Sequence, residues 1–198
     1  MKWILRPVLL VFALLLAAPA WAGDVEDCGS DALFETAPAR IVAACLAVQG
    51  KAFAQYNLGI MYQNGKGVPQ DYAEAIKWYH KVAEQGFAPA QHNLGFMYQN
   101  GQGVPQDYAE AVKWYRRAAD QGHAPAQVNL GGMYADGQGV PQDYVQAHMW
   151  FNLAAARTPT SDTENRDISV KNRDIVAAKM TPTQIAEAQK LAREWKPK

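Results

Sequence analysis

Apolar residues recur through the middle of the chain at helical spacing, in segments separated by glycine and proline. In the first segment they fall on one helix face, at Ala54, Leu58, Met61 and Tyr62. Gly65 and Gly67 follow and provide the backbone freedom that a tight loop needs. A second segment again has its apolar positions on one face, at Tyr72, Ala75, Ile76, Tyr79 and Ala83. The pattern predicts two helices joined by a glycine-rich loop.

Helix-start signals support this prediction. Asp71 is followed three residues later by Glu74, the spacing of a capping box, and Asp107 with Glu110 repeats it. Gly86 then stands where a helix end favours a left-handed residue. Local signals and apolar spacing therefore indicate the same helix boundaries.

The two-helix unit repeats at an offset of 36 residues, since the triplet at Asn57 returns at Asn93 and again at Asn129. The glycine-rich loop that starts at Gly65 returns at the same offset with one substitution. A fixed period of this size is typical of a solenoid, in which helix pairs stack on their neighbours.

The repeated pattern L-G-x-x-Y-x-x-G-x-G-V-x-x-D-x-x-x-A-x-x-W-Y-x-x-x-A resembles that of Sel1-like repeats, which are relatives of tetratricopeptide repeats. It runs from Leu58 and from Leu94, and a third copy from Leu130 has Phe151 in place of the tyrosine. The resemblance implies an all-α fold, a right-handed α-solenoid of antiparallel helix pairs with repeats at about 52–87, 88–123 and 124–157. We expect helical caps within residues 23–51 and 158–198.

Features at both ends of the array predict these caps. Residues 36–50 align with the second helix of a repeat but lack its aromatic positions. After the third repeat, Ser161 with Glu164 and Thr181 with Gln184 predict two further helix starts. The last helix has its apolar face at Ile185, Ala188, Ala192 and Trp195.

The first 22 residues have the three parts of a secretory signal peptide. Lys2 and Arg6 precede an apolar run over residues 8–18, and a small-x-small triplet ends at Ala22, directly before Gly23. The alternative is an uncleaved membrane anchor, but the run is shorter than the roughly 20 residues of a spanning helix. We expect cleavage between Ala22 and Gly23, no stable membrane span afterwards, and a periplasmic or secreted protein.

Export changes the interpretation of the two cysteines. In an oxidising compartment, Cys28 and Cys45 are expected to form one structural disulfide. The full chain of 198 residues has 19 basic and 19 acidic side chains, so no basic excess indicates a nucleic-acid partner. A hydrophobic content of 49% argues against disorder.

The residues offer little catalytic chemistry. The four histidines lack metal-ligand spacing, and the few serines of the mature chain lack a nucleophile motif, so we expect no cofactor, no metal and no enzyme. His148 replaces an aliphatic residue of the other repeats and is expected to pack against the C-terminal helices. Trp78, Trp114 and Trp150 recur at one repeat position, which favours packing between helices over ligand binding.

Some first-helix positions change between otherwise similar repeats. They read Tyr56, His92, Val128; Ile60, Phe96, Gly132; and Gln63, Gln99, Ala135. In tetratricopeptide-like arrays the first helices line the concave face, so the resemblance implies that this stripe faces a groove. The candidate binding residues are Tyr56, Asn57, Ile60, His92, Asn93, Phe96 and Asn129.

Two structural alternatives remain open for this stripe. The asparagines could bond within the solenoid, and the changing positions could reflect drift on a solvated face. We expect a non-enzymatic interaction module that binds a protein or peptide of the cell envelope. Two other functions compete: an envelope enzyme acting on cell-wall or β-lactam material, although S-x-x-K is absent, and a purely structural role.

Overall fold

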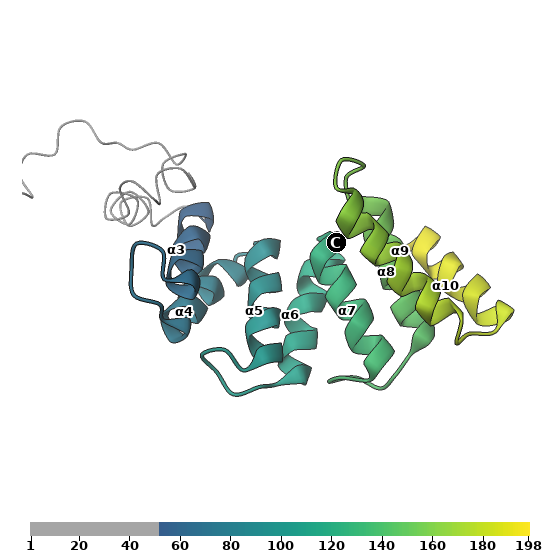
Figure 1. Cartoon of the computed structure of the whole chain (residues 1–198), viewed down its shortest axis with the longest axis horizontal. Coiled ribbons are helices and arrows are strands. Elements are labelled where there is room, and N and C mark those ends of the chain that lie inside the picture. Colours follow the sequence, from purple (N-terminus) through teal and green to yellow (C-terminus); the bar gives the residue numbers. More distant parts are fainter. Residues whose placement is uncertain (1–51) are drawn as a thin grey trace, which may run out of the picture.

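The computed structural model describes residues 52–198, which form eight α-helices and no strand (Figure 1). The helices are α3 (Ala52–Asn64), α4 (Tyr72–Ala83), α5 (Ala88–Asn100), α6 (Tyr108–Asp120), α7 (Ala124–Asp136), α8 (Tyr144–Arg157), α9 (Thr163–Ala177) and α10 (Pro182–Glu194). The predicted signal peptide, the Cys28–Cys45 disulfide and the N-terminal capping helix lie outside the described residues. None of these eight helices combines the length and apolar content required to cross a membrane.

The helices form consecutive pairs along the long axis of the molecule (Figure 1). Within the pairs, α3 packs on α4, α5 on α6 and α7 on α8, while α4 contacts α5 and α6 contacts α7 to join neighbouring pairs. The predicted all-α solenoid of helix pairs is confirmed. We call α3, α5 and α7 the first helices, and α4, α6 and α8 the second helices.

Each second helix begins at an aspartate that ends the preceding loop. Asp107 Oδ1 accepts a hydrogen bond from the Glu110 backbone N–H at 2.9 Å. The Asp107 N–H donates to the Tyr98 carbonyl at 2.9 Å, so the Glu110 side chain pairs with Lys113 at 2.7 Å and does not complete a capping box. The aspartate thereby ties the loop back to the first helix while it starts the second.

A glycine in each first helix allows its second helix to approach closely. Gly95 faces the ring of Tyr115, and a Cβ added at Gly95 would lie 2.6 Å from the ring atom Cδ1. Gly131 has the same relation to Phe151, where the closest ring atom would be 2.8 Å away. Because Tyr115 is fully buried, its ring has no open space into which it can move.

Two of the three recurring tryptophans are buried between helices, as predicted, whereas Trp78 is only half-buried. Trp114 and Trp150 are only 4% and 2% exposed. The Trp150 ring meets the Trp195 ring edge to face at a centroid distance of 6.2 Å. Trp195 follows α10, so the last of these tryptophans also attaches the C-terminal helix to the array.

The two C-terminal helices both pack on α8 and barely contact one another. The predicted capping box at Thr181 and Gln184 is present. The predicted start at Ser161 is wrong by one residue, because the Asp162 side chain caps α9 by accepting from the Asn165 N–H. His148 is buried in α8, and this burial lowers its pKa. Arg173 and Asp174 of α9 lie close enough to shift the same pKa in opposite directions, so His148 lies beside the first C-terminal helix, in line with the prediction.

Candidate functional site

In the first two repeats, the changing residue near the centre of the first helix bonds to an asparagine of the next repeat. Asn93 Nδ2 donates to the Tyr56 hydroxyl at 3.4 Å. One repeat later, Asn129 Nδ2 donates to His92 Nε2 at 3.1 Å. His92 Nδ1 also lies 3.3 Å from Asn93 Oδ1. Because a carboxamide nitrogen can only donate, His92 Nε2 accepts and Nδ1 carries the proton, so these contacts make one continuous chain of hydrogen bonds from Asn129 through His92 and Asn93 to Tyr56.

A second ring packs against each of these side chains. The Tyr56 ring meets Phe87 at a centroid distance of 5.2 Å, and the His92 ring meets His123 at 5.3 Å. Phe87 and His123 occupy the same repeat position, directly before a first helix. We call each set a rung: a ring on a first helix, a ring before the next first helix, and the asparagine that bonds to the first ring.

Burial determines the charge state of the second rung. Burial lowers the pKa of the His92 imidazole, so this side chain is neutral at pH 7. Burial, with a contribution from neighbouring His92, lowers the pKa of His123 to about 4. The rungs are therefore uncharged at neutral pH and are suited to hydrogen bonding and stacking.

The candidate binding residues are now placed. Asn93 and Asn129 bond within the solenoid, the internal role that the sequence left open, while Asn57 is buried at 7% exposure. Ile60 is half-buried, and Phe96 is the most exposed of the candidates, at 39%. The structure brings Tyr56, His92, Asn93 and Asn129 together in the rungs; their role in binding stays a prediction.

The change at Gln63, Gln99 and Ala135 has a structural origin, which corrects its inclusion in the stripe. Gln99 Oε1 accepts from the buried Tyr115 hydroxyl at 2.7 Å, and Gln63 does the same for Tyr79 at 2.5 Å. In the third repeat the tyrosine is Phe151, which has no hydroxyl, and the glutamine is Ala135. The two positions change together because they bond to one another.

The third rung is incomplete. Val128 stands where the first two rungs have Tyr56 and His92, and Pro159 stands where they have Phe87 and His123. A pocket of about 360 Å³ opens at this point. It is lined by His92, Ala124, Pro125, Val128, Asn129, Thr158, Pro159, Asp162, Asn165, Ile168 and Ser169.

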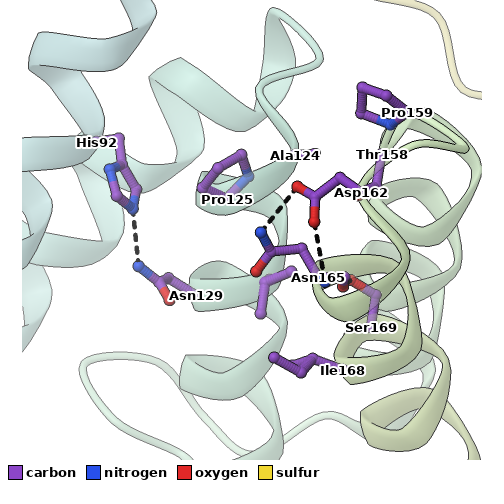
Figure 2. A pocket seen from close by; sticks show the side chains of 11 residues that line it. His92, Ala124, Pro125, Asn129, Thr158, Pro159, Asp162, Asn165, Ile168 and Ser169 are labelled. Carbon is purple, nitrogen blue, oxygen red and sulfur yellow. Dashed lines mark hydrogen bonds between the residues drawn. The ribbon is translucent and has the colours of Figure 1, made fainter.

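Two polar pairs form opposite walls of this third-rung pocket (Figure 2). Hydrogen-bonded His92 and Asn129 lie on the α5–α7 side. On the α9 side, Asn165 Nδ2 donates to Asp162 Oδ2 at 2.8 Å. Ile168 lies below them with 43% of its surface exposed and adds apolar surface to the pocket.

Large exposed apolar side chains are concentrated on one set of helices. Within residues 52–198 they are Phe53 on α3, Phe96 on α5, and Ile168 and Ile175 on α9. The second helices and α10 have none of them. We call the side formed by α3, α5, α7 and α9 the first-helix face. Sequence reasoning missed Ile168 and Ile175, although their spacing of seven residues on one helix indicates a shared face.

The fold is an α-solenoid of helix-pair repeats. Among the described residues, no group of three potential metal ligands occurs. The chain belongs to the Sel1 repeat family, whose family model matches residues 52–87, 88–123 and 124–158. Proteins of this family generally act as protein–protein interaction modules and are typically non-enzymatic scaffolds. No curated protein matches the chain.

Two solved structures are similar to this chain. A protective antigen of uropathogenic Escherichia coli with an SLR fold is 32% identical, has a TM-score of 0.71, and aligns over 83% of this chain and 36% of its own. A Sel1 repeat protein from Oxalobacter formigenes is 34% identical with a TM-score of 0.56, over 74% of this chain and 64% of its own. The chain thus spans about a third of the first protein and just under two thirds of the second.

Proposed function

We propose that this protein is a non-enzymatic adaptor or scaffold that binds a protein or peptide of the cell envelope on its first-helix face. The observation that carries the proposal is the location of Phe53, Phe96, Ile168 and Ile175, the large exposed apolar side chains of the described residues, on α3, α5 and α9. Exposed apolar side chains gathered on one side of a molecule mark interaction sites. The general role of Sel1 repeats as interaction modules supports the same conclusion.

The proposed location, periplasmic or secreted, rests on the signal-peptide pattern of residues 1–22. Mass spectrometry of the protein recovered from fractionated cells tests it. We expect a mature N-terminus at Gly23 in the periplasmic or culture fraction. Recovery of the uncleaved chain in the membrane fraction would contradict this location and support the anchor.

The binding experiment compares two double variants of the expected mature chain, residues 23–198, in affinity capture from envelope extract. Phe96→Ala with Ile175→Ala removes exposed apolar surface from α5 and α9. Lys77→Ala with Lys113→Ala is the matched control, because both lysines are exposed on second helices. Mass spectrometry identifies a partner, and its affinity for purified proteins is then measured.

We expect the apolar double variant to bind that partner at least 10-fold more weakly, and the lysine variant to bind within 2-fold of the original chain. Circular dichroism checks that helicity is unchanged in both variants. Equal binding by the apolar variant and the original would refute the first-helix face as the site. Tyr56 is unsuitable for this test, because it packs on Tyr79 and Phe87 and its truncation would disturb the core.

A further inference from the structure

The third-rung pocket lies where the solenoid lacks a ring that its other rungs contain. In the first rung Tyr56 packs against Tyr79 and Phe87, and in the second His92 packs against Tyr115 and His123. At the third rung the corresponding first-helix residue is Val128, whose side chain is too short to fill the space and has no hydrogen-bonding atom. The pocket opens beside this valine.

The polar groups that would receive a ring remain at this site. Asn129 follows Val128 in sequence, as Asn93 follows His92, and it ends the hydrogen-bond chain at the pocket wall. Asn165 lies across the pocket on the first turn of α9 and donates to Asp162 (Figure 2). Carboxamides and a carboxylate therefore line the pocket on both sides and are able to bond to a group that both donates and accepts.

The register of α9 also makes the pocket more apolar than the other rungs. Asn129 is the sixth residue of α7, and the sixth residue of α9 is Ile168. The pocket therefore has an isoleucine at the helix position that holds the bonding asparagine in the preceding repeats. With Val128 and Pro159, Ile168 supplies aliphatic surface suited to the face of an aromatic ring.

We propose that the third-rung pocket binds a tyrosine side chain of a protein partner, whose ring takes the place of the missing rung residue. The ring packs among Val128, Pro159 and Ile168, and its hydroxyl bonds within the polar walls formed by Asn129 and Asn165. The volume of about 360 Å³ lies within the range of small-ligand pockets and exceeds the needs of one side chain. The inference rests on the proposed binding function and specifies the partner chemistry of one part of the first-helix face.

The test uses N-acetyl-L-tyrosinamide as the probe, with N-acetyl-L-phenylalaninamide and N-acetyl-L-alaninamide as controls. Each is titrated into ¹⁵N,¹³C-labelled chain 23–198, and chemical shifts of the Asn129 and Asn165 side-chain amides and the Ile168 methyls are followed. We expect saturable shifts from the tyrosine probe with a Kd on the order of 1–10 mM, as suits a ligand of one side chain. The phenylalanine probe should bind at least 3-fold more weakly and the alanine probe should not saturate.

Val128→Tyr is the decisive variant, because it places a ring of the chain itself in the pocket and so completes the third rung. We expect it to fold, to unfold at no lower temperature than the original, and to bind the tyrosine probe at least 10-fold more weakly. Ile168→Glu, at a half-open position on α9, supplies a second test if Val128→Tyr does not fold, and we expect the same loss. Unchanged binding by the folded variant would overturn the proposal.

Three further results would also overturn it: no saturable shift with the tyrosine probe, equal shifts with the alanine probe, or binding of the phenylalanine probe as tight as that of tyrosine. Phe96 and Ile175 do not line this pocket, so the capture experiment reports on the first-helix face independently. A partner lost with Phe96 and Ile175 while the tyrosine probe fails to bind would leave the proposed function standing and remove this inference. Probe binding without any dependence of capture on Phe96 and Ile175 would show that the pocket accepts a tyrosine ring and would refute the role of these two exposed residues in capture.

Discussion

The hydrogen bond between Gln99 and Tyr115 predicts an energetic coupling that can be measured by mutation and then introduced into the third repeat. Tyr115 is fully buried, and its hydroxyl donates to Gln99 Oε1 at 2.7 Å. Tyr115→Phe removes this bond and leaves the glutamine oxygen without its donor, so we expect a loss of about 1–2 kcal/mol in the free energy of unfolding. Gln99→Ala removes the acceptor instead, and we expect a similar loss because the buried hydroxyl proton then has no acceptor.

The double variant should be only slightly less stable than either single variant, since the second change removes no further bond. The expected coupling energy of the cycle is therefore about 1 kcal/mol. Urea denaturation followed by circular dichroism measures all four proteins, and the cycle cancels the greater helix propensity of alanine over glutamine. Additive losses, with a coupling under about 0.3 kcal/mol, would show that the bond contributes nothing specific.

A second experiment introduces the same tyrosine and glutamine into the third repeat, which has Phe151 and Ala135 at these positions. Phe151→Tyr introduces a hydroxyl beside Ala135, where no glutamine accepts it, and Ala135→Gln supplies the acceptor. Phe151 and Ala135 line the same cavity of about 220 Å³, which provides room for the added atoms. We expect the pair together to be more stable than the sum of the two single changes by about 1 kcal/mol. A sum that matches the pair would refute the explanation given for the change at this position.

Two further predictions concern packing and pH. Gly95→Ala should lower the free energy of unfolding by about 2–3 kcal/mol, because the added Cβ would lie 2.6 Å from Tyr115. A Cβ added at Gly132 would have no other atom within 4 Å, so Gly132→Ala should be neutral or stabilising in the same urea assay. Stability should fall as the pH drops from about 6.5 to about 4, since the unfolded histidine binds its proton near pH 6.5 while folded His123 stays neutral to about pH 4. After allowance for its partial exposure we expect this histidine to contribute about 1–2 kcal/mol of the loss, and His123→Gln should remove that share. Equal stability of both glycine variants, or the same pH dependence with and without His123, would contradict these predictions.

Much of the fold follows from local signals in the sequence. Helix pairs, loop glycines and aspartate caps act over a few residues, so the three repeats and the start of α10 at Thr181 could be predicted without tertiary structure. The start of α9 was placed one residue early, because Ser161 and Asp162 are both good caps and only the fold shows which one bonds. The family resemblance could also be recognised from the sequence, because its motif consists of the loop glycines, the capping aspartate and the apolar positions of the two helices.

Partner choice across repeats was decided by tertiary structure alone. The sequence marked Tyr56, His92 and the asparagines as candidates, but the bonds that join them span neighbouring repeats and depend on how the helix pairs stack. A pattern along one helix shows which residues share a face; it does not show which side chain of another helix meets them. For the same reason the third-rung pocket could not be predicted, because it results from a short side chain at Val128 and from the register in which α9 packs on α8.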